Sequence, residues 1–176
     1  MTHSDASAFY LPLRTLHVLG AMIYLGALLV SLWWKLGADR SGDPAFAART
    51  HRRLRKLDGQ FIGPAALVTF AAGYAMVRFL GGRIAHHNFV LIGLTLLFAS
   101  LGLWYFGMRN LGDKLAVDAE SAEAARQPLG AQYAKRSAAW VLLAGLAIAL
   151  VVVTVVVMVY GGSGRVAWLY DGPGAP

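Results

Sequence analysis

The chain has 176 residues, of which 57% are hydrophobic and 14% are charged, and its formal net charge is +7. Soluble domains contain about 25% charged residues, so this composition excludes an ordinary soluble domain. The chain contains no cysteine, which excludes disulfides, thiolate metal sites, iron–sulfur clusters and covalently attached haem.

Four apolar segments of membrane-spanning length follow one another along the chain, at residues 9–36, 61–80, 88–108 and 138–160. Each approaches or exceeds the roughly 20 residues that cross a bilayer core. Helices satisfy all their backbone groups within one lipid-exposed span, so we expect these segments to be helical. The sequence predicts an all-α protein, a single four-helix transmembrane bundle over residues 1–176, with no cleaved signal peptide.

The connection between the first two spans, residues 35–58, is basic, and it begins at Lys35. Its Asp43-Pro44 pair predicts an N-cap followed by the first residue of a helix. We expect this helix, residues 44–57, to lie at the membrane surface and His51 to be solvated. The connection from 109 to 136 is also basic, and its Ala- and Glu-rich stretch 118–126 predicts an exposed helix.

The two basic connections set the expected orientation. Lysine and arginine concentrate in cytoplasmic loops, so both connections are expected in the cytoplasm and both termini on the outer, periplasmic side. We therefore expect a multi-pass protein of the bacterial inner membrane. Because the positive charge flanks apolar spans, we expect lipid contact and no nucleic-acid partner.

His17 lies inside the first span, where an ionisable side chain is costly and is therefore a candidate functional residue. In the expected orientation, His86 and His87 at the start of the third span lie in the same leaflet. Imidazole is a common ligand of haem iron and of transition metals. His17 and either His86 or His87 could thus hold one haem b between the first and third spans.

Other residues near His17 suit a flat cofactor. Gly20 follows it by one turn on the same face, where a small residue leaves room for a porphyrin or for close helix packing. Arg14 precedes His17 by one turn, and Arg83 precedes the histidine pair. Either guanidinium could pair with a haem propionate or reach lipid phosphates.

Two other interpretations of the same histidines stay open. His17 could be a neutral histidine bonded to a backbone carbonyl or hydroxyl of a neighbouring helix. The outer-leaflet histidines could instead bind copper, with Met22 and Met158 as possible soft ligands. No phosphate-binding loop, catalytic Ser or Cys arrangement or carboxylate pair within a span supports a hydrolase or a nucleotide-driven protein.

The first and second spans resemble a known superfamily of small polytopic membrane proteins. It includes HemJ-type protoporphyrinogen oxidases, copper-resistance CopD-like proteins and uncharacterised predicted integral membrane proteins. The resemblance covers about residues 13–110, and it is carried by Leu16-His17-Val18-Leu19-Gly20, Tyr24, Gly26, Leu57, Pro64 and Thr69.

This resemblance implies a haem b or, in the CopD branch, a copper ion, held by His17 and one of His86 or His87. The histidine pair takes the place of the family's second-helix histidine. HemJ-type proteins carry a lysine two residues after the third-span histidine, where this chain has Phe89.

The function expected from these observations is that of a b-type haem membrane protein in electron transfer or a small redox reaction, which is compatible with a membrane oxidoreductase. Its partners would be the lipid bilayer and a membrane or periplasmic redox partner; a homo-oligomer is compatible with the sequence. The alternatives are a copper-binding or copper-transporting protein that uses the same histidines, and a cofactor-free accessory subunit of a membrane complex.

Overall fold

The computed structural model describes residues 3–79 and 88–162, which are helical almost throughout. The elements are α1 (His3–Ser41), α2 (Pro44–Leu57), η1 (Asp58–Ile62), α3 (Gly63–Phe79), α4 (Asn88–Gly102), η3 (Leu103–Met108), α5 (Arg109–Ala125) and α6 (Ala131–Gly162). Backbone angles stay helical where α2, η1 and α3 join, and where α4, η3 and α5 join. The described chain therefore forms four long helices, which confirms the predicted all-α four-helix bundle.

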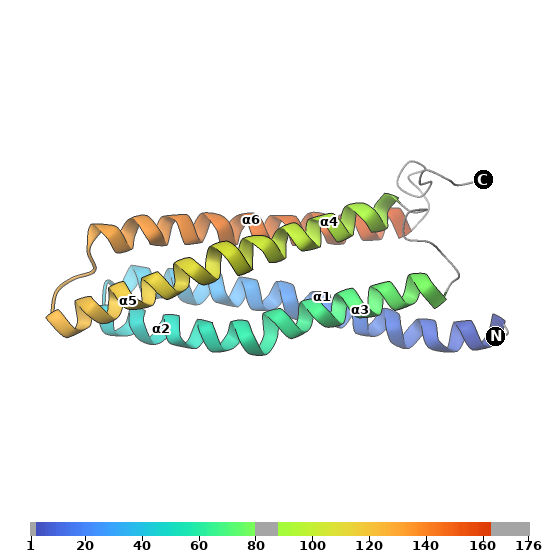
Figure 1. The fold of residues 1–176 in the computed structure, drawn as a ribbon, viewed down its shortest axis with the longest axis horizontal. Coiled ribbons are helices and arrows are strands. Elements are labelled where there is room, and N and C mark those ends of the chain that lie inside the picture. Colours follow the sequence, from blue (N-terminus) through green and yellow to red (C-terminus); the bar gives the residue numbers. More distant parts are fainter. Residues whose placement is uncertain (1–2, 80–87, 163–176) are drawn as a thin grey trace.

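The long helices run side by side and alternate in direction (Figure 1). α1 begins, α3 ends, α4 begins and α6 ends at one end of the bundle, which we call the terminal end. The connections 42–43 and 126–130 lie at the opposite end, the loop end. α1 packs along α3, α4 along α6, and α2 along α5.

All four helices are long and apolar enough to cross a membrane, over Phe9–Ser41, Pro44–Arg78, Asn88–Ala125 and Ala131–Gly161. These stretches of 31 to 38 residues exceed the roughly 20 that span a bilayer core. The predicted spans lie within them, apart from residues 79 and 80, and the helices continue beyond the spans toward the loop end.

Exposed aromatic side chains lie toward both ends of the apolar stretches. Trp33 of α1, Phe61 of η1 and Phe106 of η3 are exposed toward the loop end. Tyr74 of α3 and Tyr160 of α6 are exposed toward the terminal end. Aromatic residues favour the two membrane–water interfaces, so we expect the lipid-facing band to lie between these two sets.

The loop half of the bundle corrects one prediction. α2 does not lie on a membrane surface; it is the first part of the second long helix and packs along α5. Its small apolar stripe, including Ala47 and Ala48, is fully buried and belongs to the same core cluster as Leu115 and Ala119 of α5. The apolar face of α2 thus packs against another helix and does not lie on the membrane surface.

The predicted helix start at Asp43 is confirmed, since its carboxylate accepts a hydrogen bond from the backbone N–H of Ala45 at 2.9 Å. The second long helix bends between α2 and α3 (Figure 1), and Pro64 is the second residue of α3. There the N–H of Gly63 donates to the carbonyl of Asp58, five residues back, in the π-helical segment η1. Proline lacks an N–H, and π-helical turns and prolines are the usual causes of such bends.

Candidate functional site

His17 faces α3 near the terminal end and is partly buried. Its Nδ1 lies 2.7 Å from the backbone carbonyl oxygen of Thr69. A carbonyl only accepts, so Nδ1 carries the proton and donates it, which leaves the lone pair on Nε2. Within residues 3–79 and 88–162, Nε2 makes no hydrogen bond. This is the arrangement of a neutral histidine bonded to a backbone carbonyl, and it is also how metal-binding histidines are usually oriented.

Two glycines bring α1 and α3 close together around this histidine. A Cβ atom on Gly73 would lie 2.9 Å from Nδ1 and 3.0 Å from Cε1 of His17. A Cβ atom on Gly20 would lie 2.6 Å from Oγ1 of Thr69. Thr69 therefore fills the space beside Gly20, and Gly20 serves close helix packing in this structure. Room for a porphyrin against Gly20 stays a prediction.

Among the described residues, no contact joins Arg14, Met22 or Met158 to His17. Arg14 is exposed on α1. Arg83, His86 and His87 lie outside the described residues, so the two-ligand pairing stays a prediction. Met22 is 65% exposed, and Met158 packs against Gly93 between α4 and α6, so neither thioether joins His17. In the described part of the chain, no group of three or more His, Cys, Asp or Glu could hold a metal.

A second site, which the sequence analysis missed, lies toward the loop end around Lys35. Its Nζ is 2.5 Å from both carboxylate oxygens of Asp39 and 2.7 Å from Oγ of Ser137 on α6. Asp39 also accepts hydrogen bonds from Ser137 at 2.5 Å and from the Tyr133 hydroxyl at 2.8 Å. Nε2 of His51 on α2 lies 3.3 Å from the same hydroxyl. We call these five residues the Lys35 cluster.

The Lys35 cluster corrects one expectation. His51 is not solvated, because it is buried between α2 and α6 against Tyr133. Lys35, which begins the basic connection in the sequence, is also buried, and its side chain is 0% exposed. Burying an ammonium is costly unless a counter-ion and further hydrogen bonds compensate, and here the three donors of Lys35 all find acceptors.

Further polar side chains lie on the buried face of α1 between His17 and Lys35. The Tyr24 hydroxyl is 2.9 Å from Oγ of Ser100 on α4, and Ser100 donates to the carbonyl of Ala147 on α6 at 3.2 Å. Ser31 is 1% exposed, and its hydroxyl makes no hydrogen bond within the described chain. A signal for this face is present in the sequence, since His17, Tyr24 and Ser31 recur every seven residues.

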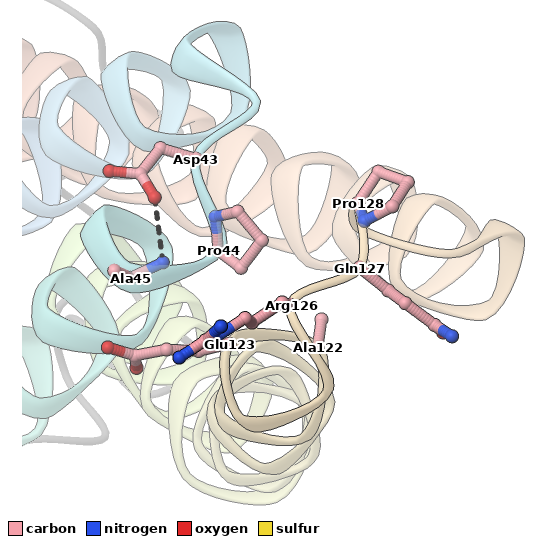
Figure 2. A pocket seen from close by; sticks show the side chains of 8 residues that line it. All are labelled: Asp43, Pro44, Ala45, Ala122, Glu123, Arg126, Gln127 and Pro128. Atoms are coloured by element: carbon pink, nitrogen blue, oxygen red, sulfur yellow. Dashed lines mark hydrogen bonds between the residues drawn. The ribbon is translucent and has the colours of Figure 1, made fainter.

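A surface hollow at the loop end is lined by Asp43–Ala45 and by residues of the connection after α5, including Arg126 (Figure 2). Arg126 has a left-handed backbone (φ 53°) that ends α5. The Asp43 carboxylate already accepts a hydrogen bond from the Ala45 N–H, drawn as a dashed line in Figure 2. The hollow thus belongs to the helix ends and is remote from His17.

A family model described as a predicted integral membrane protein (DUF2269) matches residues 11–161. Comparison with curated proteins and with solved structures finds no match. The family match supports a multi-pass integral membrane protein, and the finer HemJ- or CopD-like affiliation stays a prediction.

Proposed function

We propose that this chain, which belongs to the DUF2269 family of predicted integral membrane proteins, binds haem b through Nε2 of His17. Its role would be electron transfer or a small redox reaction in the membrane. The observation that supports this proposal is the contact between Nδ1 of His17 and the Thr69 carbonyl. That contact fixes the tautomer with a free Nε2 and holds the ring in one orientation, as a backbone carbonyl does for metal-bound histidines.

The donor set around His17 is compatible with haem. A neutral imidazole is a common axial ligand, and a bound haem supplies one-electron chemistry whose potential depends on ligands and burial. Arg14, which is exposed on α1 one turn nearer the terminal end than His17, could bind a propionate. The resemblance to HemJ-type and CopD-like proteins adds His86 or His87 as the second ligand and Arg83 as a second guanidinium.

The test is the optical spectrum of the detergent-purified protein, oxidised and reduced. Wild type is expected to show a Soret band, and His17→Ala is expected to lose it. His51→Gln is the matched control, because it replaces a buried histidine at the other end of the bundle and should keep the band. A His17→Ala protein with its full Soret band would refute the proposal.

Metal analysis of the same sample distinguishes haem binding from the two alternative functions, copper binding and a cofactor-free accessory role. Iron with porphyrin supports the proposal. Copper without porphyrin supports a copper-binding or transport protein, although neither Met22 nor Met158 lies beside His17 to assist it. A colourless, metal-free protein that co-purifies with a larger complex would identify an accessory subunit.

We also propose that the protein lies in the bacterial inner membrane with its loop end in the cytoplasm. The support is the excess of Lys and Arg in the two basic connections. Because the chain has no cysteine, a single Ser41→Cys substitution at the loop end can be labelled cleanly. An impermeant maleimide should label it only after the cells are permeabilised; labelling of intact cells would reverse the orientation.

A further inference from the structure

The cations of α2 differ in whether the bundle supplies a counter-ion. Arg52 pairs with Glu120 of α5, and Arg55 pairs with Asp113 of α5. Arg53 and Lys56 are exposed on the outer surface of α2. Within residues 3–79 and 88–162, neither of these two makes an ion pair or a hydrogen bond. The bundle thus neutralises the arginines at the contact of α2 with α5 and leaves the outer cations unneutralised.

The two outer cations belong to a longer exposed stripe. Phe46, Arg49, Arg53 and Lys56 follow one another at spacings of three and four residues, which places them on one face of α2, and we call them the basic stripe. Phe46 is 40% exposed. Arg49 lies 3.9 Å from the Asp43 carboxylate, but both side chains are more than half exposed, so this pair is weak. Like charges at these spacings repel each other, so an anion from outside would stabilise α2.

The basic stripe runs away from the membrane, because α2 runs along the bundle (Figure 1). Phe61, the exposed aromatic residue at the loop-side edge of the expected lipid band, follows Lys56 by five residues and Arg49 by twelve. These separations correspond to about 8 Å and about 18 Å along a helix. The headgroup layer of a bilayer is only about 5–8 Å thick on each side. Lipid headgroups therefore reach Lys56, whereas Arg49 and Phe46 lie beyond them.

A second copy of this chain is a poor source of the missing anions. Four carboxylates near the loop end already form ion pairs within the bundle, those of Asp39, Asp113, Asp118 and Glu120. A copy that offered these groups to the basic stripe would have to break one pair for each pair it formed. The carboxylates that fit the stripe must therefore come from another protein.

We propose that the basic stripe binds an acidic helix of a partner protein on the loop side of the membrane. Carboxylates three and four residues apart on that helix would lie opposite Lys56, Arg53 and Arg49, and an apolar residue would cover Phe46. A guanidinium can bind a carboxylate through two parallel hydrogen bonds, and arginine and aromatic residues are enriched in protein interfaces. The proposal does not depend on haem, nor on which side of the membrane the loop end faces.

A competing explanation is that these cations only set the orientation of the protein in the membrane. Orientation depends on the number of positive charges near the spans, and it needs no binding partner. Binding by the purified full chain in detergent therefore separates the two explanations, because insertion is then complete and orientation no longer plays a part.

The test measures the fluorescence anisotropy of a labelled synthetic helical peptide added to the full chain in detergent. The matched peptide carries three glutamates at the spacing of the cations and a leucine at the position opposite Phe46; a scrambled peptide has the same composition. Wild type is expected to bind the matched peptide about tenfold more tightly than the scrambled one, and less tightly as salt is added.

Two double variants separate the stripe from net charge. Arg49→Gln/Arg53→Gln should lower the affinity for the matched peptide to that for the scrambled one. Lys114→Gln/Lys135→Gln is the matched control, because it removes the same charge from exposed positions on α5 and α6, and it should bind as wild type does. All four side chains are exposed, and circular dichroism of each variant checks that the helices are retained.

Three results would overturn the proposal. The first is equal affinity of wild type for the matched and scrambled peptides. The second is an equal loss in the two double variants, which would show a response to net charge alone. The third is a loss in Lys56→Gln with no loss in Arg49→Gln/Arg53→Gln, which would confine binding to the level of the lipid headgroups and assign the stripe to them.

Discussion

The terminal half and the loop half of the bundle accommodate buried polar side chains in different ways. In the terminal half, one backbone carbonyl satisfies His17, and glycines let α1 and α3 close around it. In the loop half, Lys35 requires Asp39 on its own helix and hydroxyls from α6. An imidazole can stay neutral and needs one acceptor, whereas an ammonium needs a counter-ion. The loop half should therefore be the more sensitive to loss of a polar side chain.

The largest loss of stability is expected from breaking the Lys35–Asp39 ion pair. Asp39→Ala leaves the Lys35 ammonium buried without its counter-ion, and removal of one partner of a buried pair costs about 3–5 kcal/mol. The measurement is the free energy of unfolding in mixed detergent micelles, followed by circular dichroism. The double variant Lys35→Met/Asp39→Leu should recover part of this loss, because it leaves no buried charge, although the Ser137 and Tyr133 hydroxyls still lose Asp39 as their acceptor. Equal losses in the single and double variants would contradict a coupled pair.

The next largest loss of stability is expected from overpacking the contact between α1 and α3 in the terminal half. Gly73→Ala would place its methyl group 2.9 Å from Nδ1 of His17, and such overpacking costs about 1–3 kcal/mol. The Soret band, if haem is bound, should shift or weaken because the ring must move. Gly26→Ala is the control, since no atom lies within 4 Å of its added carbon. Alanine is the better helix former, so Gly26→Ala should be neutral or slightly stabilising.

A double-mutant cycle sharpens this second prediction. If the cost of Gly73→Ala comes from the histidine ring, it should largely disappear in a His17→Ala background. A cost that stays the same with and without His17 would mean that another contact of α3 limits the size of residue 73.

The sequence predicted the four helices correctly, but it did not predict which side chains of the loop half are buried. Both outcomes follow from the fact that a sequence pattern describes one helix at a time. Apolar length alone identifies a spanning helix, so the four helices and the Asp43-Pro44 start were accessible from the sequence. Lys35 was assigned to a basic connection expected in the cytoplasm, and His51 was expected to be solvated, because polar residues next to a span usually are. Their burial depends on α6 and α2 meeting α1, and a recurrence within α1 can mark the buried face but does not identify the helix that covers it.

His17 illustrates an intermediate case. Its position in an apolar span marked it as a candidate, and the structure supplies its partner, the Thr69 carbonyl. Every residue has a backbone carbonyl, so the sequence could not predict which carbonyl His17 contacts. The seven-residue recurrence of His17, Tyr24 and Ser31 was available in the sequence, and it marks the face that α1 buries.

A smaller effect is expected midway between the two halves. Tyr24→Phe removes one hydrogen bond to Ser100, which keeps its bond to the Ala147 carbonyl, so no partner is left unsatisfied. The expected loss in free energy of unfolding is about 0.5–1.5 kcal/mol. Tyr105→Phe, on an exposed ring, is the control and should stay within about 0.5 kcal/mol of wild type. Equal losses for the two would show that the Tyr24 hydroxyl adds nothing to stability.

The smallest effect is expected at the exposed ion pairs of the loop half, which sharpen the contrast with the buried one. Arg52 of α2 lies 2.6 Å from Glu120 of α5, but both side chains are about half exposed, at 53% and 47%. Water competes for exposed charges, so Glu120→Gln should cost about 0.2–1 kcal/mol, and less at high salt. The same unfolding measurement at low and high salt checks this. A loss as large as that of Asp39→Ala would mean that the contact of α2 with α5 depends on charge, and that its buried alanines contribute less than their packing implies.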